Sequence, residues 1–409
     1  MKRYWKLVTI AVVIVLVIGT FYIQSSMAAS DDPEFMFKTV DGNEEELDSI
    51  ALFGNYQIGT RFSDLKITKE GTEYKKINSF LGQFNSLYTD EEIERLKTDY
   101  RNFMRGKTES ENLFFEDTSL IAYVNMDMKT SLNSYESTDF SLDISVLDKD
   151  TEKHYSFNIK LPESERYHSV SVEKVYIDDG DMKILTNNFY YDDQTDYAEQ
   201  VEYHVYQVNL ADQKIVNDEV IAKTDGESSD QQMELSLVEQ SENADRNTKI
   251  GIVKKTLQEK VIDEWQSTYE TIESELIVYD IVTSKQETLE IQEELLENLL
   301  VYNSGDTFYL THETDEGLEV AAYNHETKEL ETKQTIPLSD SLPDYQSLYK
   351  IENDKLYIIS PFAAMGTDAV ISIADLKTGE SLFEGTIEMK NPVQENMDYG
   401  LYFHDLEIN

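Results

Sequence analysis

The stretch VYDIVTSKQET, residues 278–288, offers a carboxylate at Asp280, a hydroxyl at Thr283 and an amine at Lys285. Groups of this kind at close spacing could bind a ligand or transfer a proton. The same frame recurs, however, as an Asp or Asn followed three positions later by Thr or Asp, and it starts at Asp148, Asn209, Asp280, Asn324 and Asp375. Because the residues after it change from copy to copy, we interpret the frame as a turn and predict that function lies in the segments that do not repeat.

Two acidic clusters are the densest mixtures of carboxylates and turn residues: DDGD, Asp178–Asp181, and YYDDQTDY, Tyr190–Tyr197. Calcium favours such oxygen-rich loops. Neither cluster matches the D-x-[DN]-x-[DN]-G calcium loop, so we interpret both as solvated turns, with calcium binding as the lesser alternative. With 81 Asp and Glu in the chain, no carboxylate pair stands out as catalytic.

Other signatures of chemistry are absent from the sequence. It has no G-x-S-x-G elbow, no phosphate-binding G-x-x-x-x-G-K-[ST] or G-x-G-x-x-G loop, no H-E-x-x-H and no Cys. We predict that each of the six histidines lies at the surface or in a turn: His154, His168, His204, His312, His325 and His404. We therefore assign no catalytic residue, no cofactor-binding residue and no metal ligand, and expect the protein not to be an enzyme.

The repeated frame sits between two apolar, alternating stretches, which predicts a β-hairpin at each copy. An Asp or Asn side chain can accept a bond from a backbone N–H ahead of it and so begin the turn. Gly379 suits a left-handed residue late in the turn, whereas the corresponding Glu152, Gln213, Ser284 and Lys328 suit it less, so the turn types are expected to differ. A second hairpin is predicted in VEKVYIDDGDMKILTNN, NLLVYNSGDTFYLTH and LYKIENDKLYIISP.

Two hairpins per unit make four strands, and successive turns are 61, 71, 44 and 51 residues apart. Periods of roughly 40 to 50 residues with four strands are typical of propeller blades, and loop insertions account for the excess. The VYD-x-x-T-x-K and ADLKTGE hairpins resemble the outer hairpins of quinoprotein-like and YVTN-like β-propeller repeats over roughly residues 112–389. This resemblance implies an all-β propeller but no particular family, since the WD, kelch and quinoprotein signatures are absent; a β-sandwich or an extended sheet is the alternative.

Strands are also expected in residues 36–84 and near the C-terminus, in DYGLYFHDLEI. Because an open sheet edge invites aggregation, we predict that both termini build one shared blade that closes the ring. The five repeats and this blade give six blades, with seven as the alternative.

Two segments depart from the strand pattern. TDEEIERLKTDYRNFMRG predicts an inserted amphipathic helix at about 89–105, with a Thr89–Glu92 capping box, Gly106 as its stop, and one apolar face formed by Ile93, Leu96, Tyr100 and Phe103. Residues 224–247 are acidic and poor in apolar side chains, which predicts a long exposed loop.

The formal net charge is −46, from 35 Lys and Arg against 81 Asp and Glu. Such a charge repels phosphate backbones, which argues against nucleic acid, and it favours cationic ligands or partners, or a high-salt or alkaline setting. The acidic residues also serve simply to keep an exposed body soluble.

Residues 1–29 begin with Lys2, Arg3 and Lys6, continue with an uncharged apolar run at 7–23 and end in small residues. This order predicts an N-terminal transmembrane anchor, or alternatively a signal peptide cleaved near Ser26–Met27–Ala28. The basic start places the N-terminus inside. The expected organisation is therefore a membrane segment at 1–29 and an extracytoplasmic propeller domain at 30–409, held at the cell membrane or, if cleaved, secreted.

Together these features predict a non-enzymatic binding, sensing or accessory module for a membrane protein such as a transporter or a signalling kinase. The alternative is an exported propeller hydrolase or lyase that uses acidic residues, with or without calcium. A structural envelope protein is a third, weaker interpretation.

Overall fold

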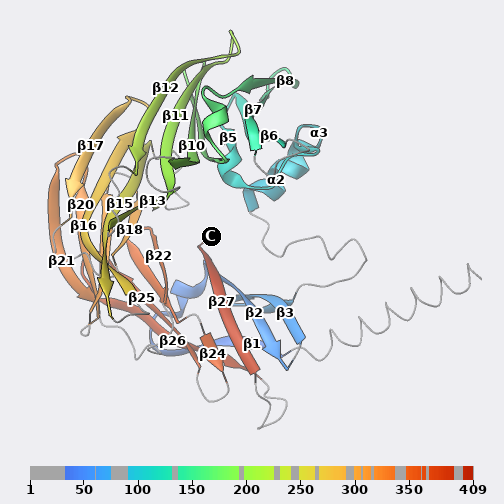
Figure 1. Cartoon of the computed structure of the whole chain (residues 1–409). Helices are drawn as coiled ribbons and strands as arrows, with labels where there is room; N and C mark the ends of the chain where they lie inside the picture. Colours follow the sequence, from blue (N-terminus) through green and yellow to red (C-terminus); the bar gives the residue numbers. More distant parts are fainter. Residues whose placement is uncertain are drawn as a thin grey trace, which may run out of the picture. The chain divides into compact units, whose positions relative to one another are not determined.

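The computed structural model describes residues 33–59, 61–74, 91–130, 137–192, 198–224, 231–240, 248–262, 267–291, 299–304, 307–314, 317–336, 347–360, 362–364, 368–390 and 399–408. Most of them lie in β strands, and the strands form six sheets (Figure 1). The chain divides into two compact units, one formed by Met1–Tyr88, Thr314–Val320 and Lys333–Asn409 and the other by Thr89–Glu313 and Ala321–Thr332.

Two sheets in the first unit combine strands from both ends of the chain. The first has the order β1 (Phe35–Gly42), β26 (Ser381–Met389), β25 (Ala369–Asp375), β23 (Lys355–Ile359), β22 (Leu348–Glu352). The second has the order β24 (Phe362–Ala364), β27 (Tyr399–Ile408), β2 (Ile50–Ile58), β3 (Arg61–Thr68), β4 (Gly71–Tyr74). Both β1–β26 and β2–β27 are antiparallel pairs. The sequence predicts one sheet shared by the two ends, and the structure has two.

The remaining strands form four sheets in chain order, except that β14 of the sixth sheet precedes three strands of the fifth. The third sheet contains β5 (Phe114–Glu116), β6 (Leu120–Thr130), β7 (Ser137–Asp148) and β8 (Lys153–Lys160), and the fourth contains β9 (Ser169–Asp178), β10 (Asp181–Asp192), β11 (Ala198–Asn209) and β12 (Lys214–Lys223). The fifth has the order β13 (Gln231–Leu237), β15 (Lys249–Val261), β16 (Ser267–Asp280), β17 (Lys285–Glu290). The sixth has the order β14 (Glu239–Gln240), β18 (Leu300–Ser304), β19 (Thr307–Thr314), β20 (Gly317–Asn324), β21 (Glu329–Ile336).

All five predicted turn frames join neighbouring antiparallel strands, which confirms the hairpin interpretation. The prediction that their turn types differ is wrong. Each turn has a residue with left-handed backbone at the same position, with φ of 53°, 54°, 52°, 59° and 70° at Glu152, Gln213, Ser284, Lys328 and Gly379. The side chain that begins each turn explains why four of them tolerate a residue other than glycine. Asp148, Asn209, Asp280, Asn324 and Asp375 each accept a bond from the backbone N–H three residues ahead, at 2.7–3.0 Å, which fixes the turn before the left-handed residue.

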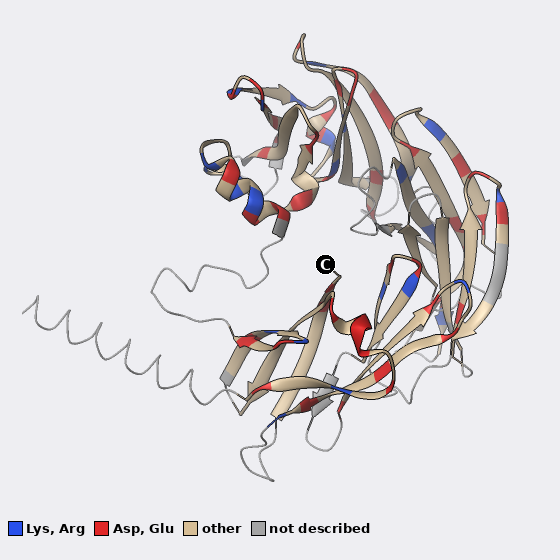
Figure 2. Ribbon diagram, turned by 180° about the vertical axis from the view of Figure 1, so that it is seen from behind, with Lys and Arg blue, Asp and Glu red and all other residues tan. Residues whose placement is uncertain are grey.

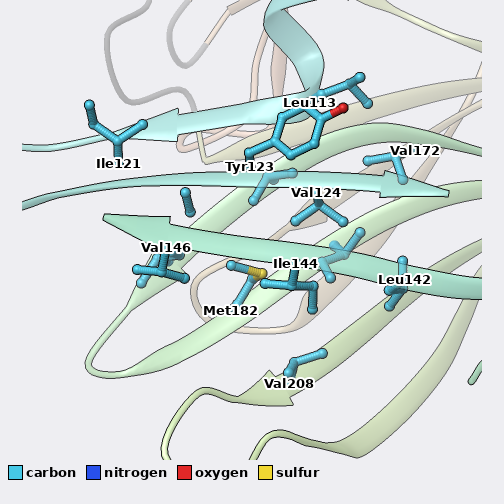
Figure 3. Close-up of a cluster of buried hydrophobic side chains, with 14 of the residues drawn as sticks. Leu113, Ile121, Tyr123, Val124, Leu142, Ile144, Val146, Val172, Met182 and Val208 are labelled. Carbon is cyan, nitrogen blue, oxygen red and sulfur yellow. The ribbon is translucent and has the colours of Figure 1, made fainter. Parts of the chain in front are cut away.

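Consecutive sheets within each unit pack face to face through apolar side chains. One core lies between the third and fourth sheets, and Figure 3 shows Val124 and Ile144 of the third together with Met182 and Val208 of the fourth. A second core joins the fourth and fifth sheets, a third joins the fifth and sixth, and a separate core joins the two sheets of the first unit. Several antiparallel sheets stacked in this way are consistent with a β-propeller, whereas the sandwich alternative would give two sheets.

The fifth and sixth sheets approach closely at Gly251. A Cβ on this residue would lie 2.5 Å from a ring carbon of Phe308 and 2.9 Å from a methyl carbon of Val238. Asn303 also donates to the backbone carbonyl of Lys249 at 3.1 Å. Glycine is therefore required here for its small size, and it sets the spacing of these two sheets.

The predicted inserted helix is present as two short helices, α2 (Glu91–Asp99) and α3 (Arg101–Met104), beside β5–β8 (Figure 1). Ile93, Leu96 and Phe103 are buried in the core of the third and fourth sheets, and Tyr100 packs against it, as the apolar face predicts. Gly106 follows with a φ of 79°, a left-handed stop. Thr89, half of the predicted capping box, lies outside the described residues. Among the described residues there are also three single-turn helices, namely η1 (Glu44–Leu47), η3 (Glu111–Leu113) and η4 (Ser164–Arg166).

The prediction of a long exposed loop at 224–247 is wrong for the residues that the structure describes. Residues 231–237 form β13, which pairs with β15, and Glu239–Gln240 form β14. Met233, Leu235 and Leu237 alternate with more exposed polar residues, as in a strand with one face against the core. The acidic composition of the segment as a whole concealed this short alternation.

Acidic residues are scattered over strands, turns and helix α2 (Figure 2). In the part of the chain that the structure describes, no helix is both long and apolar enough to cross a membrane. The predicted anchor or signal segment, residues 1–29, lies outside that part.

Candidate functional site

The frame VYDIVTSKQET turns the chain and does not gather its functional groups. The Asp280 carboxylate accepts from the backbone N–H groups of Val282 and Thr283, at 2.9 and 3.0 Å, and forms an ion pair with Lys249. Burial alone would raise the pKa of Asp280, but Lys249 and the turn bonds outweigh burial and lower it. Lys285 points to solvent at the start of β17. The interpretation of this frame as a turn is confirmed.

The DDGD cluster is also a turn, between β9 and β10. Asp179 and Gly180 have left-handed backbones, with φ of 48° and 85°. Asp181 accepts from the side-chain amides of Gln207 and Asn209, at 2.7 and 2.8 Å. In YYDDQTDY, residues 193–197 lie outside the described part of the chain. Within that part, no group of three or more acidic or histidine side chains has the arrangement of a metal site.

His204 contradicts the prediction that every histidine lies at the surface or in a turn. It lies within β11, with only 4% of its surface exposed. Its Nδ1 is 2.7 Å from Asp218 Oδ1, and its Nε2 is 3.2 Å from Glu202 Oε2. The physical reason is that these carboxylates supply the partners that a buried imidazole needs.

Around His204 lies a network of polar side chains, the His204 cluster, formed by Arg166, Tyr167, Glu202, His204 and Asp218. Arg166 donates to both Glu202 oxygens, at 3.1 and 2.9 Å. The Tyr167 hydroxyl is 3.3 Å from Glu202 Oε2 and 3.2 Å from His204 Nε2.

Aromatic rings and amides enclose this network. The Tyr206 ring stacks on His204 with centroids 5.3 Å apart, and Arg166 lies 3.8 Å from the centroid of the Tyr190 ring. Asn188 donates to the Tyr206 hydroxyl at 3.1 Å. The cluster extends the core of the third and fourth sheets, to which Tyr167 and Tyr206 belong.

The charges of the cluster stabilise one another. Burial would lower the pKa of His204, but its hydrogen bonds and ion pairs with Asp218 and Glu202 outweigh burial and raise it. Burial would raise the pKa of Glu202, but His204 and Arg166 lower it to about 2. Burial raises the pKa of Tyr167 to about 12. When His204 is protonated, the positive charges of Arg166 and His204 balance the negative charges of Glu202 and Asp218.

A tyrosine beside a histidine and a carboxylate has the composition of a general acid–base site. The geometry does not favour that use, because Tyr167, Glu202 and His204 are 3%, 4% and 4% exposed and already contact one another. The Arg166 and Asp218 side chains, 40% and 31% exposed, connect the cluster to solvent, whereas the three inner groups do not reach it. The arrangement suits a polar core better than a substrate site.

A different place offers open space. A hollow of about 280 Å³, here called the Lys255 hollow, lies between strands of the fifth and sixth sheets and is lined by Ser236, Leu237, Val238, Val253, Lys255, Leu299, Leu300, Val301 and Tyr302. Six of its nine lining residues are Leu or Val, while polar and apolar atoms contribute equally to its surface. Val238, Val253 and Val301 also belong to the core between these sheets. Lys255 brings an ammonium to this lining and donates to the Leu299 carbonyl at 3.3 Å. The hollow is close to the lower end of the size range of small-molecule sites, about 300–1,000 Å³.

Sequence reasoning missed both places. In VEYHVYQV, every second residue points to the same face of the strand, and one face carries Glu202, His204, Tyr206 and Val208. Apolar residues are present on both faces of this strand. A Glu and a His on such a face indicate a paired polar core, and this signal was present in the sequence. No comparable pattern in the sequence indicates the Lys255 hollow. Its lining comes from three strands, and their arrangement cannot be predicted from the sequence.

No protein family and no curated protein matches this sequence. Similar solved structures include a polysaccharide lyase, Uly1, at 12% identity and a TM-score of 0.31, over 71% of this chain and 57% of the lyase. They also include apo AztD from Citrobacter koseri at 7%, with a TM-score of 0.31 over 87% and 98% of the two chains, and TolB from Acinetobacter baumannii at 9%, with a TM-score of 0.23 over 79% and 92%. At these TM-scores the likenesses carry no argument about function.

Proposed function

We propose that this protein is an extracytoplasmic, membrane-anchored binding module that takes a small ligand and is not an enzyme. The observation that supports the proposal is the contrast between its two polar places. Tyr167, Glu202 and His204 are buried and paired with one another, whereas the Lys255 hollow is open, is lined largely by Leu and Val residues and carries one ammonium. An apolar hollow with a few placed polar groups is the usual form of a ligand site.

Native mass spectrometry of the full chain, purified from its own host in mild detergent, tests ligand binding. Ser236 lies on the hollow's lining and is exposed, so Ser236→Trp should block the space with little cost to folding. We expect a bound mass on the wild type that is lost in Ser236→Trp and kept in Ala211→Trp, an exposed turn substitution. A protein without any bound mass, or a mass that Ser236→Trp leaves in place, would contradict the proposal.

The proposal extends to location and partner. The basic, then apolar, then small-residue order of residues 1–29 supports a single anchor with the body outside the cytoplasm, with secretion after cleavage as the alternative. A membrane protein such as a transporter or a signalling kinase is the partner we propose. Photo-crosslinking in cells from the exposed turn positions Asp150, Asp212 and Lys377 should capture one membrane protein from some positions and not others. Equal capture from all three, or none, would count against a specific partner.

The fold proposed for this module is a six-bladed propeller, with seven blades as the alternative. Six sheets among the described residues and the pairing of both chain ends within sheets support it. Averaged electron-microscopy images of the body should show six-fold modulation around a central axis.

An exported hydrolase or lyase is the second candidate, and the proximity of Tyr167, Glu202 and His204 is the observation in its favour. It requires a substrate to reach groups that the structure buries. A panel of saccharide and ester substrates, with and without chelator, tests this alternative. Turnover that is lost in His204→Gln, while the variant keeps its fold, would favour the enzyme over the binding module.

A further inference from the structure

The register of the fifth sheet places Lys255 on the side of the Lys255 hollow. Val253 pairs with Ser236, and both line the hollow; Lys255 lies two residues further along β15 and therefore on the same face. Lys254 lies on the opposite face and pairs with Leu235, which packs against the core shared with the fourth sheet. One strand thus carries two adjacent lysines, of which only Lys255 serves the hollow.

The Lys255 ammonium is suited to a negatively charged group. An ammonium has three donors, and the Leu299 carbonyl accepts from one of them through a long 3.3 Å contact. A carboxylate accepts charge-assisted bonds that are stronger than bonds to a neutral carbonyl. The hollow is partly enclosed, so its effective dielectric constant is lower than that of bulk water and such a bond is stronger there.

The rest of the lining suits an apolar group. Val238, Val253 and Val301 are buried walls, and Leu300 and Tyr302 are half-buried. A ligand that placed an apolar chain against these side chains would remove apolar surface of both partners from water. The hollow therefore presents an apolar wall and a cationic end at the same time.

We infer that the Lys255 hollow binds a small amphipathic carboxylate, with its carboxylate on Lys255 and its apolar chain against Val253 and Val301. This inference rests on the proposed binding function and adds the class of ligand. It runs against the cationic preference that the net charge predicts, for a reason of distance. Salt screens charges beyond about 8 Å at physiological ionic strength, so the group in contact with the ligand outweighs the distant acids.

Glu234 lies directly across from Lys255 in the register of β13 and β15, and it is exposed. Residues opposite one another on antiparallel strands have Cβ atoms about 5 Å apart, close enough for a carboxylate to compete for the ammonium. Removing this charge should therefore improve binding of an anionic ligand. The pair Lys255 and Glu234 gives two substitutions with opposite expected effects on the same measurement.

The test is isothermal titration of the full chain with octanoate, octanol and octylamine. Octanoate should bind best. Lys255→Met, which keeps an apolar stem, should weaken octanoate about tenfold and leave octanol unchanged, the loss expected for one charge-assisted hydrogen bond. Glu234→Gln should tighten octanoate several-fold, and the matched control Lys254→Met should change neither probe.

The outcomes separate this inference from the function on which it rests. Equal binding of the three probes, or octanoate binding that Lys255→Met does not weaken, overturns the carboxylate class and leaves ligand binding intact. Failure of all probes at concentrations near their solubility limit also overturns the class. In that case, mass spectrometry could still detect a ligand on the wild type and none on Ser236→Trp. This result would support the binding function with a ligand of another class.

Discussion

The His204 cluster and the Lys255 hollow both place charged side chains at the junction of two packed sheets. They differ in how deeply these side chains are buried and in how many partners they have. In the cluster, Glu202 and His204 exchange bonds with Arg166, Tyr167 and Asp218, and the inner groups are almost fully buried. In the hollow, Lys255 has one long bond to a backbone carbonyl and an adjacent space.

This difference separates a structural from a binding use of charge. A buried ion that keeps all of its partners has no bond left for a ligand, and removing one partner leaves the others unpaired at high cost. A half-buried ammonium beside apolar side chains contributes little to the stability of the fold but can contribute much to the affinity for a ligand. The two places should therefore respond in opposite ways to substitution.

The largest effect is expected from Glu202→Ala. The substitution leaves Arg166 and His204 without the carboxylate that they share, so the free energy of unfolding should fall by about 3 kcal/mol. Urea denaturation of the body measures this loss. Glu165→Ala, which removes an exposed acid next to Arg166 in the chain, is the control and should stay within about 0.5 kcal/mol. A loss below about 1 kcal/mol for Glu202→Ala would contradict the interpretation that the cluster stabilises the fold.

A smaller loss, about 1–3 kcal/mol, is expected from Gly251→Ala beside the hollow. The added methyl group would collide with Phe308 and Val238 and push the fifth and sixth sheets apart. The double variant Gly251→Ala, Phe308→Leu should recover part of the loss, which thermal and urea unfolding would detect as non-additivity. Strictly additive losses would show that this contact does not set the spacing of the sheets.

The cluster should also give stability a pH dependence. The raised pKa of His204 contributes stability that is fully present below about pH 6.5, the ordinary value, and is lost as pH rises through the higher folded pKa. The lowered pKa of Glu202 contributes stability that is present above about pH 4.5 and is lost as pH falls toward about 2. The cluster should therefore stabilise the fold most between about pH 4.5 and 6.5.

His204→Gln tests the alkaline side of this window. The difference in unfolding free energy between wild type and variant should be larger at pH 6 than at pH 9, by about 1.4 kcal/mol for each unit by which the pKa is raised. Comparing wild type with variant at each pH cancels the response of the chain's many other acids. A difference that does not change with pH would mean that His204 does not gain its proton preferentially in the folded state.

The smallest effect is expected from Lys255→Met in the absence of ligand. The ammonium loses one long bond, so the free energy of unfolding should change by no more than about 0.5 kcal/mol in urea denaturation. Lys254→Met is the matched control from the other face of β15. A loss above about 1.5 kcal/mol would mean that Lys255 stabilises the fold as Glu202 does. It would contradict the proposed difference between the His204 cluster and the Lys255 hollow.

Local sequence was sufficient for the hairpins because a turn is built from neighbouring residues. Asp280 and Thr283 are three positions apart, and the bond between them closes within one turn. The buried face of α2 followed from the spacing of Ile93 and Leu96 in the same way. The strand at 231–237 was missed because its alternation is short and acidic residues surround it in the sequence.

The candidate site required contacts that the sequence does not state. Arg166 and Glu202 are far apart in the chain, and Lys255 meets Leu299 only because the fifth and sixth sheets pack together. The two-residue spacing of Glu202 and His204 in β11 indicates that they share a face of the strand. It does not indicate which neighbouring side chains cover that face.

The sequence by itself determined the β-rich character of this protein, its hairpins, its turn residues and its acidic charge, because each depends on composition or on residues a few positions apart. Tertiary structure alone decided that His204 is sealed and that Lys255 borders open space. The physical reason is that burial depends on how closely the next sheet packs, and that distance is set by side chains from distant segments, such as Phe308 against Gly251.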